Sequence, residues 1–121
     1  MAKIERNPPV DADAMDTFLK AADFALPNDF LDFFKKSDGA EIRTEDHYVL
    51  LWPIPEIIQL NEDYGVEEYA PGFFLFGSDG GGTAYAIEKA TGFIFELPFI
   101  AMSKDEAIFK SKNFTDFIGL D

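Results

Sequence analysis

The sequence predicts a single α+β domain, in which an antiparallel or mixed sheet of about five strands packs against N-terminal, middle and C-terminal helices. Two patterns favour this class: apolar residues recur at helical spacing near both ends, and short runs of β-branched and aromatic residues lie between them. Of the 121 residues, 47% are hydrophobic and 14 are Phe, which is enough for one buried core. We expect residues 1–9 to form an N-terminal tail and residues 10–121 to form the domain.

Two helices are expected in the N-terminal third of the chain. The first covers residues 10–25, and either Asp11 or Asp13 can cap its N-terminus. Its apolar positions at helical spacing are Met15, Phe18, Leu19 and Ala22. Asn28 is placed to cap the second helix, which is expected to end at Asp38-Gly39. The apolar positions of this second helix are Phe30, Leu31, Phe33 and Phe34.

Five short strands are predicted in the middle of the chain. They are residues 41–43, 47–52, 73–77, 83–87 and 93–97. A turn at residues 44–46 would join the first two strands, and a short helix at 55–61 would follow them, leading into a polar loop at 65–72. The last three strands are separated by short Gly-containing turns, which predicts an antiparallel meander. Residues 104–110 and 113–118 have helical spacing and are expected to pack on the sheet.

Acidic residues are concentrated in the middle of the chain. The formal net charge is −13, and the stretch from residue 44 to residue 88 contains nine acids and no Lys or Arg. These acids are Glu45, Asp46, Glu56, Glu62, Asp63, Glu67, Glu68, Asp79 and Glu88. Nucleic acids and anionic membranes are bound by clustered basic residues, so the composition argues against both as partners. The acids form either a solvated surface or a face that attracts a basic protein.

No residue pattern predicts catalysis, a metal site or a cofactor. The chain has no Cys, no Ser lies in a Gly-x-Ser-x-Gly motif, and the single histidine, His47, is expected to be solvated near a turn. The segment Asp79-Gly80-Gly81-Gly82 lacks the spacing and the Lys of a phosphate-binding loop and favours a tight hairpin. The lack of Cys, of an apolar N-terminal stretch and of a long apolar run leads us to expect a soluble, cytoplasmic protein.

Several short motifs occur in an order that resembles the SUKH superfamily. They are Leu26-Pro27-Asn28-Asp29-Phe30, Ser37-Asp38-Gly39-Ala40, Asn61 with Tyr64, the segment Phe76-Gly77-Ser78-Asp79-Gly80-Gly81-Gly82-Thr83-Ala84-Tyr85, and Asn113-Phe114-Thr115-Asp116-Phe117-Ile118. The resemblance covers about residues 22–120, and it departs from the family pattern at Ala40 and Asn113. It implies a mixed α+β domain without a fixed set of catalytic residues. Bacterial members are chiefly immunity proteins that neutralise a partner toxin, whereas a eukaryotic branch is linked to cell-wall assembly and signalling.

The leading hypothesis from this resemblance and the charge is an immunity protein that binds a cognate toxin with a basic surface, such as a nuclease. The partner-binding residues are predicted to be Glu62, Asp63, Tyr64, Glu67, Glu68, Tyr69 and Asp79, the two Tyr side chains serving as anchors. Two alternatives remain at this point. One is a cell-wall or regulatory interaction domain without a toxin partner, and the other is an enzyme or small-ligand binder that uses the same acids.

Overall fold

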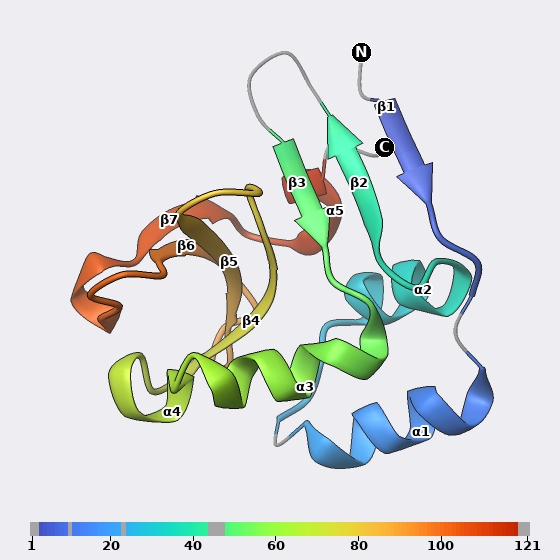
Figure 1. The fold of residues 1–121 in the computed structure, drawn as a ribbon, viewed down its shortest axis with the longest axis horizontal. Coiled ribbons are helices and arrows are strands. Elements are labelled where there is room, and N and C mark those ends of the chain that lie inside the picture. Colours follow the sequence, from blue (N-terminus) through green and yellow to red (C-terminus); the bar gives the residue numbers. More distant parts are fainter. Residues whose placement is uncertain (1–2, 10, 23, 44–47, 119–121) are drawn as a thin grey trace.

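The computed structural model describes residues 3–9, 11–22, 24–43 and 48–118, which fold as one α+β domain (Figure 1). Its strands form one antiparallel sheet in chain order: β1 (Lys3–Arg6), β2 (Ala40–Arg43), β3 (Tyr48–Leu51), β4 (Phe73–Ser78), β5 (Thr83–Glu88), β6 (Ile94–Pro98) and β7 (Ile108–Ser111). The helices are α1 (Ala12–Ala21), α2 (Asn28–Lys36), α3 (Ile54–Asp63), α4 (Val66–Tyr69), the 3₁₀ turn η1 (Lys104–Glu106) and α5 (Phe114–Ile118). The predicted class and the antiparallel sheet are confirmed.

The sheet has seven strands rather than about five, and both additional strands lie at its edges. Strand β1 pairs with β2, so residues 3–6 belong to the sheet although residues 1–9 were expected to be a tail. Strand β7 lies at the end of the expected helix over residues 104–110, of which η1 is the only helical part. Both edge strands have four residues and pair with one neighbouring strand each, so they are defined by that pairing more than by a local sequence pattern.

Three details of the helices differ from the prediction. Asp11 caps α1 as expected by accepting a 2.7 Å hydrogen bond from the backbone N–H of Ala14, but Leu19 on the same helix is 40% exposed. Asn28 is the first residue of α2 and makes no capping hydrogen bond. The loop expected at residues 65–72 contains helix α4. The predicted turn at 44–46 and His47 lie outside the described residues.

The core is built largely from Phe side chains that join the helices to the central strands. Strand β4 is buried along its whole length, as predicted for a central strand. Phe76 on β4 contacts Phe30 of α2 at a ring distance of 5.8 Å and Phe114 of α5 at 5.6 Å. Phe74, two residues earlier and on the same face, contacts Phe18 of α1 at 6.1 Å. The tight curl of the sheet turns β1–β3 away from β5–β7, while α1 and α3 pack side by side (Figure 1).

Candidate partner-binding surface

Six of the seven predicted binding residues lie together where α3 meets α4. Helix α3 ends at Asp63, Tyr64 follows as its C-cap, and after Gly65 helix α4 begins at Val66. Gly65 makes this sharp change of direction possible, because its φ of +66° is in the left-handed region that favours glycine. A Cβ at Gly65 would also lie 3.0 Å from the ring of Tyr69. We call this surface the acidic corner; it consists of Glu62, Asp63, Tyr64, Glu67, Glu68 and Tyr69.

The acidic corner combines charge with two exposed aromatic rings. Its four carboxylate residues are all exposed, and Tyr64 and Tyr69 are 39% and 55% exposed. The ring of Tyr64 packs against Phe99, with 4.6 Å between the ring centroids, and Tyr69 lies over Gly65. Each Tyr is therefore supported on one side and open on the other. Such rings offer contact area to a partner at a low cost in conformational entropy.

Asp79, the seventh predicted residue, is not part of this corner. It follows the last residue of β4, whereas α4 precedes the first, so the length of a six-residue strand, roughly 17 Å, separates the two places. The half-buried Asp79 carboxylate accepts hydrogen bonds from the backbone N–H groups of Gly81 (2.8 Å) and Thr83 (3.2 Å). Gly80 has a φ of +81°, which agrees with the predicted tight hairpin. Asp79 thus organises the β4–β5 turn.

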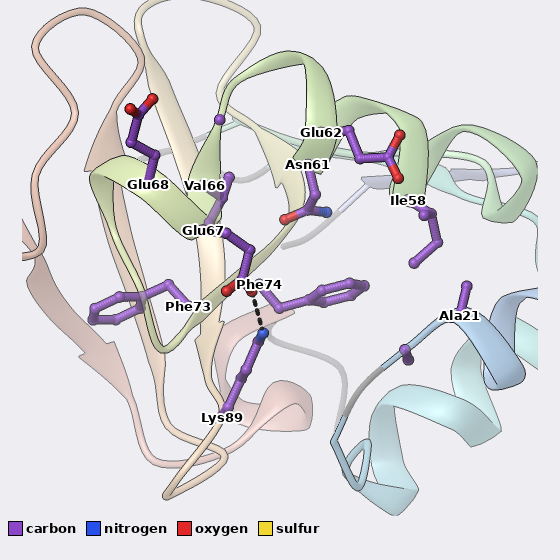
Figure 2. Close-up of a pocket in the computed structure, with 12 residues that line it drawn as sticks. Ala21, Ile58, Asn61, Glu62, Val66, Glu67, Glu68, Phe73, Phe74 and Lys89 are labelled. Carbon is purple, nitrogen blue, oxygen red and sulfur yellow. Dashed lines mark hydrogen bonds and ion pairs between the residues drawn. The ribbon is translucent and has the colours of Figure 1, made fainter.

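A pocket of about 400 Å³ opens beside the acidic corner (Figure 2). It is lined by Ala21, Ala22, Ile58, Asn61, Glu62, Gly65, Val66, Glu67, Glu68, Phe73, Phe74 and Lys89. These residues come from α1 and its C-cap, α3, α4, the start of β4 and the turn after β5. Sequence reasoning identified three of the acids but missed the pocket, because no local pattern indicates that these distant segments meet.

Among the described residues, Lys89 is the one basic residue that lines this pocket. Its ammonium group lies 2.8 Å from a carboxylate oxygen of Glu67, and its side chain is 18% exposed against 75% for that of Glu67. The same ammonium group lies 5.7 Å from the ring centroid of Phe24. A cation is therefore held here by both a carboxylate and an aromatic face. Figure 2 shows Glu67 between Glu62 and Glu68, with its side chain directed at Lys89.

The buried side chains of Ser37 and Ser78 have backbone partners. Ser37 donates a 2.6 Å hydrogen bond to the carbonyl of Gly39, and Ser78 accepts one of 3.2 Å from the N–H of Gly80. Burial, with smaller contributions from the charges of Asp79 and Glu96, raises the pKa of Tyr85 to about 12.

Within the described residues, no group of three or more His, Cys, Asp or Glu is arranged to hold a metal ion. Nor does that part of the chain contain a helix long and apolar enough to span a membrane.

The residues that carry the sequence motifs stabilise the fold rather than form the corner. Asp29 accepts hydrogen bonds from the N–H and the hydroxyl of Thr115, at 3.0 and 3.2 Å, and so ties α2 to α5. Asp38 accepts a 2.6 Å bond from the N–H of Ile54 and caps α3 across 16 residues of sequence. Asn61 bonds both backbone polar groups of Leu75. Apart from Tyr64, the motifs thus identify a scaffold on which the acidic corner is displayed.

A comparison with known families agrees with this scaffold. The model of the SMI1 / KNR4 family (SUKH-1) matches residues 9–119, which is most of the chain. A search of curated protein sequences finds no match. Because the match extends from before α1 to the end of α5, it includes each of the hydrogen-bonded motif residues described above. The chain therefore belongs to the SMI1 / KNR4 family (SUKH-1) and, as its motifs predicted, to the SUKH superfamily.

Proposed function

We propose that this chain is a non-catalytic immunity protein that acts in the cytoplasm by binding and neutralising a cognate toxin with a basic surface, such as a nuclease. The observation that carries the proposal is the acidic corner, which combines four exposed carboxylate residues with two supported Tyr rings. Family membership is consistent with this function. Inhibition would require only that the domain cover the toxin's own binding cleft.

Charge and aromatic contacts would contribute to different steps of such binding. The four carboxylates would attract a basic toxin from a distance and so raise the association rate, an effect that salt screens. Tyr64 and Tyr69 would be buried on contact and would slow dissociation. Glu62 and Glu68 are suited to this role, because no ion pair within the described residues involves either of them. Glu67 is already paired with Lys89.

Growth rescue tests the proposal directly. The toxin domain encoded immediately upstream in the source genome is expressed alone, with this protein, and with its Glu62→Lys/Glu68→Lys variant. We expect wild-type protein to restore growth and the variant to associate with the toxin about tenfold more slowly at low salt. A matched control, Asp105→Lys/Glu106→Lys, changes the charge equally on the exposed turn η1 and should behave as wild type.

The alternative is a regulatory or cell-wall interaction domain that uses the same corner for an endogenous basic partner. Growth rescue separates the two functions, because an interaction domain of this kind has no toxin to neutralise. If the neighbouring gene product is harmless, or kills equally with and without this protein, the immunity proposal is wrong.

A further inference from the structure

The apolar pocket beside the acidic corner is lined by both apolar and charged side chains. We propose that it binds an arginine side chain of a protein partner. The inference rests on the proposed function in one respect, because it takes the occupant to be part of a bound protein. It goes further by assigning one side-chain type to one cavity.

The walls of the pocket suit the aliphatic part of a long side chain. Ile58 of α3, Val66 of α4, Phe73 and Phe74 of β4 and Ala21 of α1 line it (Figure 2). Burying the methylene groups of an incoming side chain against this surface removes apolar area from water. The cavity of about 400 Å³ is within the size range of ordinary ligand sites.

The charge of the rim selects a cation for the end of that side chain. Glu62, Glu67 and Glu68 line the pocket with Lys89 as the opposing charge, so the lining carries an excess of negative charge. The Lys89–Glu67 pair neutralises one carboxylate and leaves Glu62 and Glu68 without an ion pair within the described residues. An apolar wall beside unpaired carboxylates is complementary to a side chain with an apolar stem and a cationic end.

The position of Lys89 shows that this environment accepts a cation. Its ammonium group contacts the Glu67 carboxylate and faces the ring of Phe24, although the side chain is only 18% exposed. A second cation would meet groups of the same kinds, since the lining combines the Phe73 and Phe74 rings with Glu67 and Glu68.

Arginine fits this setting better than lysine. Its guanidinium group is planar, stacks on aromatic rings, and is more weakly hydrated than an ammonium group, so it loses less on entering a partly apolar pocket. It can also bond a carboxylate through two parallel N–H groups, whereas an ammonium group acts as a point charge. Arginine is therefore expected to be preferred over lysine.

NMR titration of the free protein with N-acetyl-arginine-methylamide tests the site without any toxin. We expect saturable shifts of the backbone amides of the pocket, centred on α4 and on Phe73 and Phe74. The uncharged analogue N-acetyl-citrulline-methylamide should bind at least about tenfold more weakly, because its neutral ureido group cannot form an ion pair with a carboxylate. The lysine analogue should fall between the two.

Charge-neutral variants locate the interaction. Glu62→Gln/Glu68→Gln should weaken binding of the arginine analogue about tenfold, whereas Asp105→Asn/Glu106→Asn removes the same charge from η1 and should leave binding unchanged. Equal binding of the citrulline analogue would overturn the inference. So would the absence of binding, shifts scattered over the surface, or equal effects of the two double variants.

The outcome is separable from that of the proposed function. If toxin neutralisation depends on the acidic corner but the arginine analogue does not bind, only the pocket inference fails. If the analogue binds in the pocket but no toxin is neutralised, the pocket inference stands and the immunity proposal fails.

Discussion

The side-chain amide of Asn61 bonds both backbone polar groups of Leu75, accepting from its N–H at 2.8 Å and donating to its carbonyl at 2.9 Å. Strand β3 pairs with β4 only at Leu50–Ser78 and Leu51–Gly77, so it does not reach Leu75. A β-bulge also interrupts the β4–β5 pairing between Leu75 and Gly77. Asn61 therefore supplies the hydrogen bonds that a longer β3 would have provided, and it fixes α3 against the sheet.

Replacing Asn61 by Ala should destabilise the fold by about 3 kcal/mol, since it leaves the N–H and carbonyl of the fully buried Leu75 without these partners. Urea unfolding measures this change. Gln59→Ala on the same helix is the matched control: it removes one exposed hydrogen bond, to Asp63, and should cost less than about 0.5 kcal/mol. Equal stabilities of the two variants would show that the Asn61–Leu75 bonds contribute little.

Gly39 occupies a position that no other residue can take without strain. Its φ is +82°, and an added Cβ would lie 2.6 Å from the carbonyl oxygen of Leu51, a backbone atom. Gly39→Ala should therefore lower the free energy of unfolding by about 2 kcal/mol or more. Gly82→Ala is the control, because a Cβ there would meet no atom within 4 Å and the residue is not among the glycines of positive φ. A Gly39→Ala protein as stable as Gly82→Ala would contradict the close approach.

Much of this fold could be predicted from the sequence, because the central elements carry local signals. The five predicted strands correspond to β2–β6, and the expected helix at 55–61 lies inside α3. The edge strands β1 and β7 were missed, since each is defined by its pairing with a single neighbouring strand. Asn28 was favoured as a helix cap from its position alone. In the structure Pro27 is the N-cap of α2, and the neighbouring Asp29 bonds Thr115 of α5, 86 residues away.

The candidate site also contains residues that could be predicted from the sequence and residues that could not. The six residues of the acidic corner are nearly contiguous in sequence, so a run of acids with two Tyr residues was enough to indicate them. Asp79 was grouped with them by charge, but it lies at the opposite end of β4 and bonds its own turn. The pocket combines residues from 21 to 89, and only the folded chain brings them together.

Stability at high pH should depend on Tyr85. Burial, followed by the charges of Asp79 and Glu96, raises its folded-state pKa to about 12 from an ordinary value of 10.0. Its contribution to stability is therefore complete below pH 10 and is lost as the pH rises from about 10 through about 12.

Comparing wild type with Tyr85→Phe checks this dependence. The free energy of unfolding of the wild type minus that of the variant should be constant from about pH 7 to 9. It should fall above about pH 10, because only the wild type loses stability through this titration. Absorbance at about 295 nm should also show one fewer tyrosinate forming near pH 12 in the variant. A difference that stays constant up to pH 12 would mean that Tyr85 titrates equally in both states.

Lys89 should compete with an incoming arginine for Glu67. Lys89→Met keeps a long apolar side chain over Phe24 and removes the cation, so the Glu67 carboxylate becomes available to the pocket. We expect the arginine analogue to bind about threefold more tightly, a modest gain because Glu67 is largely exposed. Lys104→Met removes the same charge from the exposed turn η1 and should not alter binding. Weaker binding to Lys89→Met would instead show that Lys89 holds the pocket open, and equal binding would show that Glu67 does not contact the ligand.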